Sequence, residues 1–373
     1  MRLVGIKYLY GRNLELGINI YSVSGRLLLA RGAILTSRAI DHLKKIGIWE
    51  VYVNDPDTSD IIVEGVLDEL TRRKILMVIN DQFSKAKVVN DKRILDIDLE
   101  VFKGIIKIIL KNIFLKKQKL INLINLKTFD DYIYVHSLDV AIYSLILGVE
   151  LAIHDNKLEL LGLGAILHDV GKLFIPSSIL NKKEKLTEEE YEVLKSHVLI
   201  GYEVLGKLIG MPTASSTIAL FHHERYDGKG YPRGLKDGQI PLFSRIVSIA
   251  DVYDALISDR PWREALLPHV ALEYLLSGGD TLFDKKLVRT FMEKIAIYPL
   301  GTTVKLTTGE VGVVKDVKPG FSSRPTIRVL YDSSGKKLKT DQIYEINLLE
   351  KPSILIEKVV KTFDPKDEDE ENN

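Results

Sequence analysis

Five histidines and two aspartates in the middle of the chain are the residues best suited to chemistry. The chain has eight histidines, and these five fall close together. The seven residues are His136, His168, Asp169, His197, His222, His223 and Asp251. Asp251 stands in the apolar segment FSRIVSIADVYDAL, where an unpaired carboxylate would be costly to bury. The set therefore needs a common partner.

A divalent metal ion is the partner that this set favours, because neutral imidazoles and carboxylates are metal ligands. Seven candidate ligands exceed what one ion needs, so we expect two ions with Asp169 as a bridging carboxylate. Two such ions can share a hydroxide and clamp a phosphoryl oxygen. The ligands are rich in nitrogen and lack sulfur, which favours iron or manganese over magnesium or calcium. His42, His154 and His269 stand alone, and we interpret them as structural.

Two strings around the histidines are distinctive. His168-Asp169 begins HDVGK, and residues 222–232 read HHERYDGKGYP. The segments KLTEEEYEVLKSH and IPLFSRIVSIADVYDALISDRPWR stand in order around them. Together these strings resemble the HD-GYP subgroup of the HD phosphohydrolase superfamily, over residues 129–296. The resemblance implies an all-helical catalytic domain there.

The resemblance also implies a role for each candidate residue. One ion is held by His136, His168, Asp169 and Asp251, and a second by Asp169, His197, His222 and His223. The implied catalytic residues are Asp169 and Lys172. The implied substrate-binding residues are Lys172, Gly230, Tyr231, Pro232, Arg260 and Arg263.

The implied activity is that of a cyclic di-GMP phosphodiesterase. The substrate would be attacked by a metal-bridging hydroxide, giving mainly the linear dinucleotide pGpG. One departure from the family bears on the product. Three-metal members have a glutamate four residues before the first histidine ligand, where this chain has Tyr132. A phenol is a poor substitute for a carboxylate, so we expect two ions per chain.

Around this zone, hydrophobic patterning predicts a mainly α-helical chain with a small α+β module before it and a small β-barrel-like module after it. A hairpin around Ser24-Gly25 and a helix in TSRAIDHLKKIG indicate the first module. The expected boundaries are 1–58 for the α+β module, 59–128 for a helical linker, 129–296 for the catalytic domain, 297–350 for the β module and 351–373 for an extension with an acidic, disordered tail.

Composition excludes several other classes. The 52 basic and 51 acidic residues balance, which argues against a nucleic-acid polymer as partner. The chain has no cysteine, which fits a cytoplasmic location and excludes thiolate metal sites. We see no apolar run of about 18–20 residues, so we expect no membrane span. The helical linker is a candidate contact for a homodimer.

Three alternatives remain open from the sequence. The first is a catalytically weak sensor or interaction protein for cyclic di-GMP. The second is an HD-superfamily hydrolase that acts on another nucleotide. The third is a scaffold in which the N-terminal module and the helices matter more than the site.

Overall fold

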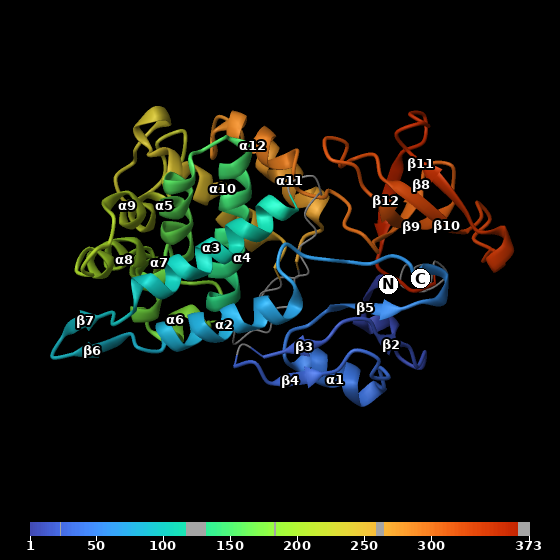
Figure 1. Cartoon of the computed structure of the whole chain (residues 1–373), viewed down its shortest axis with the longest axis horizontal. Helices are drawn as coiled ribbons and strands as arrows, with labels where there is room; N and C mark the ends of the chain where they lie inside the picture. The colour runs from blue at the N-terminus through green and yellow to red at the C-terminus, as the bar shows by residue number, and fades with distance from the viewer. Residues whose placement is uncertain (23, 117–131, 183, 259–264, 365–373) are drawn as a thin grey trace.

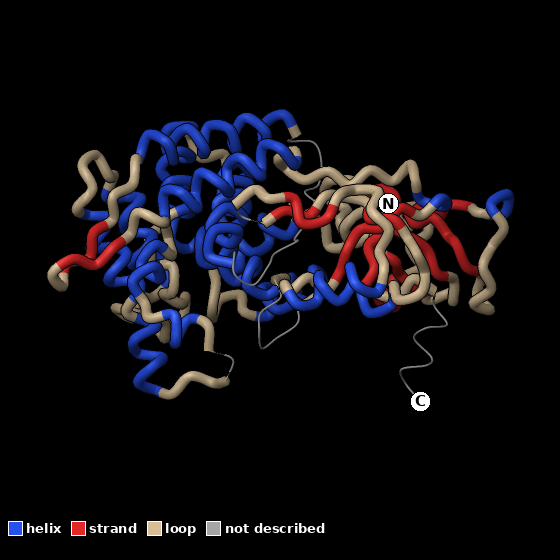
Figure 2. The backbone as a smooth tube through the Cα atoms, turned by 90° about the horizontal axis from the view of Figure 1, so that it is seen from below, coloured by secondary structure: helices blue, strands red, loops and turns tan. Residues whose placement is uncertain are grey.

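The computed structural model describes residues 1–22, 24–116, 132–182, 184–258 and 265–364. Most of the helices gather on one side of the molecule and most of the strands on the other (Figures 1 and 2). We call these two sides the helical lobe and the β lobe. The mainly helical architecture with two small β-containing modules confirms the predicted fold class.

The first part of the β lobe is the N-terminal module. Strands β1 (Arg2–Gly5), β5 (Glu50–Asn54) and β2 (Glu15–Leu16) form an antiparallel sheet in that order. Strands β3 (Ile20–Tyr21) and β4 (Leu27–Leu29) form the predicted hairpin. The predicted helix is α1 (Ser37–Lys45), which Thr36 caps by accepting a hydrogen bond from the backbone N–H of Ala39.

The C-terminal module is a five-stranded antiparallel sheet in the order β11-β10-β9-β8-β12. Its strands are β8 (Thr303–Leu306), β9 (Val311–Asp316), β10 (Thr326–Tyr331), β11 (Tyr344–Asn347) and β12 (Ile356–Val360). Strand β12 pairs with β8, although the sequence places residues 351–373 in an extension. The sheet thus continues past residue 350, and residues 365–373 lie outside the described residues.

The two modules of the β lobe are joined by hydrogen bonds between residues far apart in the sequence. The backbone N–H of Leu3 donates to the carbonyl of Gly301 at 2.9 Å, and that of Gly5 donates to Lys361 at 2.9 Å. Buried Arg2 donates through Nε to Thr303 Oγ1 at 2.8 Å. The two modules therefore make one continuous lobe.

The helical lobe is built around α4 (Tyr132–Glu150), which packs against α2, α3, α5, α10 and α12. Its other helices are α2 (Glu69–Phe83), α3 (Leu99–Leu115), α5 (Asp155–Ile166), α6 (Ser177–Leu180), α7 (Glu188–Lys195), α8 (His197–Gly206), α9 (Thr213–Phe221), α10 (Leu242–Leu256), α11 (Pro268–Ser277) and α12 (Lys285–Met292). One apolar core runs through these helices. A short hairpin, β6 (Lys87–Val89) with β7 (Lys92–Ile94), interrupts the segment that the sequence predicts as helical.

Helix α4 is apolar because it lies inside this core. Within the described residues, its segment Ile133–Glu150 is the one helix long and apolar enough to cross a membrane, which the sequence expectation overlooked. Of that segment, 83% is buried inside the structure. Packing of a core helix accounts for its composition.

Helix α2 links the N-terminal module to α4. On one side, Asn19 Nδ2 donates to Glu69 Oε1 at 2.7 Å. On the other, Arg72 Nη2 lies 2.7 Å from Oδ1 of the fully buried Asp139. Asp139 stands one turn after His136 on α4, so this ion pair fixes α2 beside a helix that carries a candidate ligand.

Candidate metal centre

The seven candidate ligands come from segments far apart in the sequence and converge in the helical lobe. His136 comes from α4, and Asp251 from α10. The His168-Asp169 doublet lies between α5 and the 3-10 helix η4 (Val170–Phe174). His197 begins α8, and His222 and His223 follow the end of α9.

The structure arranges these residues in two neighbouring groups. The first group is His136, His168 and Asp251, and the second group is Asp169, His197, His222 and His223. Within each group, one ligand atom from every residue lies within 4.8 Å of the others. Six of the seven side chains are buried, and His223 is half-buried. The structure therefore places these seven side chains together, and their role as metal ligands stays a prediction.

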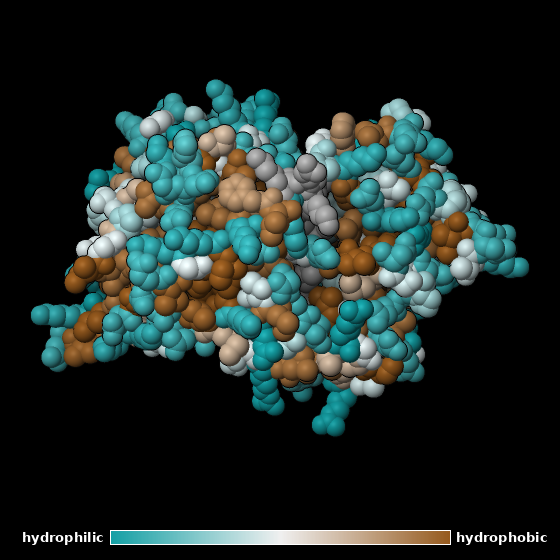
Figure 3. Space-filling view, viewed as in Figure 1, coloured by the Kyte–Doolittle hydropathy of each residue, from teal (hydrophilic) through white to brown (hydrophobic). Residues whose placement is uncertain are grey.

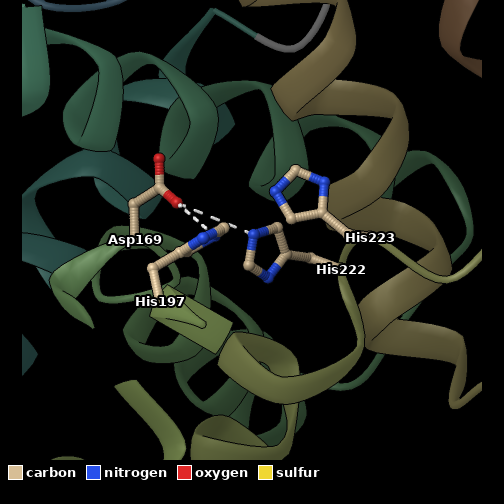
Figure 4. Close-up of side chains that lie close together, drawn as sticks. All are labelled: Asp169, His197, His222 and His223. Atoms are coloured by element: carbon tan, nitrogen blue, oxygen red, sulfur yellow. Dashed lines mark ion pairs between the residues drawn. The ribbon is translucent and has the colours of Figure 1, made fainter. Parts of the chain in front are cut away.

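Asp169 lies between the two groups, with one carboxylate oxygen toward each. Its Oδ1 is 3.3 Å from His197 Nε2 and 3.7 Å from His222 Nε2 (Figure 4). Its Oδ2 is 3.3 Å from His168 Nε2 and 3.5 Å from His136 Nε2. This is the position from which one carboxylate can serve two ions.

Backbone packing at Gly171 holds Asp169 close to His197. A Cβ atom at Gly171 would lie 2.0 Å from the carbonyl oxygen of His197 and 2.7 Å from the backbone nitrogen of Gly201. Only glycine allows η4 and α8 to approach this closely. The glycine of HDVGK is thus a packing requirement of the site.

Three histidines place Nδ1 against a backbone carbonyl and direct the other ring nitrogen into the centre. The Nδ1 atoms of His168, His197 and His222 lie 2.7, 2.7 and 3.1 Å from the carbonyl oxygens of Ala165, Leu194 and Ile218. A carbonyl oxygen can only accept, so each Nδ1 donates its proton. In a neutral ring, Nε2 then carries the lone pair that a metal ion needs.

The centre also contains buried polar atoms that the protein itself does not satisfy. Within the described part of the chain, no hydrogen bond reaches Nε2 of His168, His197 or His222, or Oδ1 of Asp169. Buried polar atoms are nearly always paired, and several unpaired ones facing each other need an explanation. A cation supplies it, so the residues present fit a bound metal.

The electrostatics keep these groups in the protonation states that metals bind. Burial lowers the pKa of His197 and, with the neighbouring His222, that of His223, so both rings stay neutral. Burial alone would raise the pKa of Asp169, but Lys172 and His168 hold it well below its usual value. The pKa of Asp251 is likewise lowered by His136 against the effect of burial.

One residue near the centre was missed from the sequence. The buried carboxylate of Asp254 lies on α10, three residues after Asp251, with its Oδ2 2.6 Å from His136 Nδ1. The sequence does contain a signal for it, because a second acid one turn from Asp251 in an apolar helix must face a partner.

The predicted substrate loop lies against the second group. Lys172 Nζ is 2.5 Å from Asp169 Oδ2, and the ring of Tyr231 stacks on His223 with centroids 4.9 Å apart.

The conformation of this loop depends on Gly230. A Cβ atom at Gly230 would lie 2.3 Å from the backbone nitrogen of Arg225, so this position also requires glycine. Glu224 braces the loop by accepting backbone hydrogen bonds from Arg233 and Leu235. Pro232, which follows Tyr231, is part of the same loop.

Two predicted substrate contacts cannot be placed. Arg260 and Arg263 lie outside the described residues, as does the side chain of Tyr132. Their proposed roles therefore rest on sequence alone.

Comparison with known proteins identifies the helical lobe. Residues 111–287 match the family model described as HD domain. Over these residues the helical lobe is similar to HD domains. Residues 303–367 match a second model, the KOW domain associated with HD domain, which includes β12. The first match falls within the helical lobe and confirms the HD resemblance seen in the motifs, and the second covers the C-terminal module of the β lobe. An HD domain implies binding of divalent metal ions, and the two groups offer ligands for them.

Several curated relatives have names that specify a substrate. A cyclic di-GMP phosphodiesterase of Pseudomonas aeruginosa is 34% identical, over 61% of this chain and 55% of the relative. The cyclic di-GMP phosphodiesterase response regulator RpfG of Xanthomonas campestris is 47% identical, over 37% of each chain. A 3'3'-cGAMP-specific phosphodiesterase of Vibrio cholerae is 35% identical, over 44% of this chain and 35% of the relative. The matches thus span about half or less of each relative's length.

Proposed function

We propose that this chain is a metal-dependent phosphodiesterase that hydrolyses cyclic di-GMP, mainly to linear pGpG. The observation that carries the proposal is the position of Asp169, with one oxygen toward each of two histidine-rich groups. Paired ion sites that share a carboxylate suit in-line displacement at phosphorus. The names of the HD-domain relatives favour a cyclic dinucleotide as the substrate.

In this proposal the two groups hold two ions, iron or manganese. The first group, together with Asp169, holds one ion, and the second group holds the other. Imidazole and carboxylate ligands without sulfur favour these metals. When bound, the ions would supply Lewis acidity toward the phosphoryl group and a water of lowered pKa.

The residues of the chain would bind and orient the substrate around that centre. Lys172 is close enough to Asp169 to donate to a phosphoryl oxygen beside it and to offset negative charge developing there. Gly230 and Pro232 hold Tyr231 over His223, where its ring can limit how the substrate enters. Burial raises the pKa of Tyr231, so the hydroxyl keeps its proton and can donate a hydrogen bond. Arg260 and Arg263 would bind the second phosphate through their guanidinium groups.

Metal analysis paired with turnover tests this function. The chain is purified without oxygen, its metals are measured, and cyclic di-GMP is supplied with Mn²⁺ or Fe²⁺. We expect two ions per chain and accumulation of pGpG. A chain with bound metal that binds cyclic di-GMP without turnover would instead be a sensor, and a chain without metal would be a scaffold.

A second substrate has support from one relative. The Vibrio cholerae protein named as specific for 3'3'-cGAMP matches this chain at 35% identity. Parallel assays with cyclic di-GMP and 3'3'-cGAMP at equal concentration decide between them through the ratio of kcat/KM. We expect the ratio to favour cyclic di-GMP.

The helical linker remains our candidate for a homodimer contact. Helix α3 exposes Ile108, Phe114 and Leu115, of which Leu115 is 74% exposed. Apolar side chains gather on the face of the helical lobe over which α3 runs (Figure 3). Sedimentation of the wild type and of a Leu115→Lys variant tests this contact. The absence of cysteine remains compatible with the proposed cytoplasmic location.

A further inference from the structure

The ring of His136 is held differently from the other rings at the centre. His168, His197 and His222 each place Nδ1 against a neutral backbone carbonyl within their own segment. His136 places Nδ1 2.6 Å from a carboxylate oxygen of Asp254, which belongs to another helix. A hydrogen bond to an ionised acceptor is about twice as strong as one to a neutral acceptor.

Helix α10 clamps the His136 ring from both sides. Asp251 and Asp254 stand three residues apart, so their side chains leave the same face of the helix. Asp251 Oδ1 lies 3.1 Å from Nε2 of His136, while Asp254 Oδ2 lies 2.6 Å from Nδ1. One carboxylate thus faces the metal side of the ring and the other faces its back.

The surroundings keep the Asp254 charge effective. Its side chain is fully buried, and His136 is 1% exposed. Tyr143 and Tyr253 pack edge to face with centroids 5.0 Å apart. Burial and the nearby Asp254 carboxylate raise the pKa of both phenols, so neither phenol carries a negative charge beside that of Asp254. In such a setting a charge acts over short distances with little screening.

We propose that Asp254 is a positioning residue for the metal centre, which fixes the His136 ring and strengthens it as a ligand of the first group. The inference rests on the proposed metal-dependent function, and it adds that the two ion sites differ in how their histidines are held. In the first group, His136 has a carboxylate behind its ring. In the second group, the described Nδ1 contacts of His197 and His222 are to backbone carbonyls. Loss of the Asp254 charge therefore weakens one ion site selectively.

The test is a Mn²⁺ titration of metal-free protein carrying Asp254→Asn. The amide oxygen can still accept from Nδ1, so the variant removes the charge and keeps the shape. Loss of a carboxylate partner behind a metal-binding histidine typically costs about 10–100-fold in metal affinity. We expect that loss at one site and wild-type affinity at the other, so that one ion binds where the wild type binds two.

Asp139→Asn is the matched control. It removes another fully buried carboxylate from the same region, but one whose described partner is Arg72. We expect this control to unfold at lower temperature and to bind both ions with wild-type affinity. If Asp254 served only to pack α4 against α10, both variants would lose stability and neither would lose an ion site.

Two results would overturn the inference. One is an Asp254→Asn isotherm that superimposes on that of the wild type, and the other is an equal loss of affinity in Asp139→Asn. Asp254→Ser, which keeps a smaller acceptor, must show the same selective loss, and circular dichroism confirms that each variant is folded. Failure of the proposed function is recognised separately, because the wild type itself would then bind no Mn²⁺.

Discussion

Replacing Gly171 with alanine tests whether close packing of two backbone segments sets the geometry of the metal centre. The added Cβ would lie 2.0 Å from the carbonyl oxygen of His197, whereas ordinary contact begins at 3.4 Å. The segments must therefore separate by about 1.4 Å to relieve this contact. The two nearest atoms, the carbonyl oxygen of His197 and the nitrogen of Gly201, both belong to the backbone, so no side-chain rotation can relieve the overlap.

The expected cost follows from that displacement. Overpacking of a core site costs about 1–3 kcal/mol, and we expect the upper end because the neighbours are backbone atoms. For a domain of this size, about 3 kcal/mol lowers Tm by roughly 6–12 °C. Metal sites tolerate errors of about 0.2 Å in ligand distances, so moving Asp169 away from His197 should cost the second group its ion.

The assay is calorimetry of the metal-free protein together with a Mn²⁺ titration. Gly206→Ala is the control, because it lies in the same helix α8 and its added Cβ would meet nothing within 4 Å. We expect the control to be neutral or stabilised by less than about 1 kcal/mol. Equal Tm and equal metal stoichiometry in Gly171→Ala and Gly206→Ala would refute the packing explanation.

Four further outcomes are expected. Asp169→Ala should lose metal and turnover while keeping its helical circular dichroism, and near-normal turnover would contradict the site. Lys172→Ala and Arg260→Ala should keep both ions in metal analysis but lose turnover by at least about 10-fold, since each offers a cation to phosphate. Chromatography of the reaction products should show that the wild type accumulates pGpG. The Tyr132→Glu variant should shift the product toward GMP. Rapid formation of GMP by the wild type would exclude the two-ion prediction. Chelation should lower Tm, because ligand at about 100 times its Kd stabilises a fold by about 2.7 kcal/mol, and an unchanged Tm would argue against bound metal.

The candidate ligands could be predicted because they depend on residue type and order. His168-Asp169 and His222-His223 are adjacent pairs whose chemistry needs a cation whatever the fold. Asp254 was not predicted, because its role depends on which helix lies opposite. Only the approach of α10 to α4 brings it to His136.

The missed strands show the same limit. The β6–β7 hairpin turns at Asn90 and Asp91, both with positive φ, and an Asn-Asp pair directly after two valines was a usable local signal. Strand β12 is short, and its pairing with β8 is a long-range contact. The union of the two modules depends on contacts such as that of Arg2 with Thr303, 301 residues apart, which no local pattern encodes.

The joined β lobe has a consequence for the chain as it is synthesised. At about 5–20 residues per second, the ribosome needs roughly 15–60 s after making Arg2 to supply Thr303. During that interval the helical lobe can emerge and fold, while Arg2 and Ile61 stay exposed because the strands that bury them have not yet been made. The nascent N-terminal module is thus exposed to chaperones and proteases until strands β8 and β9 leave the exit tunnel. Synonymous codon changes that slow translation between residues 63 and 303 should therefore lower the yield of folded chain more than equal slowing after residue 360.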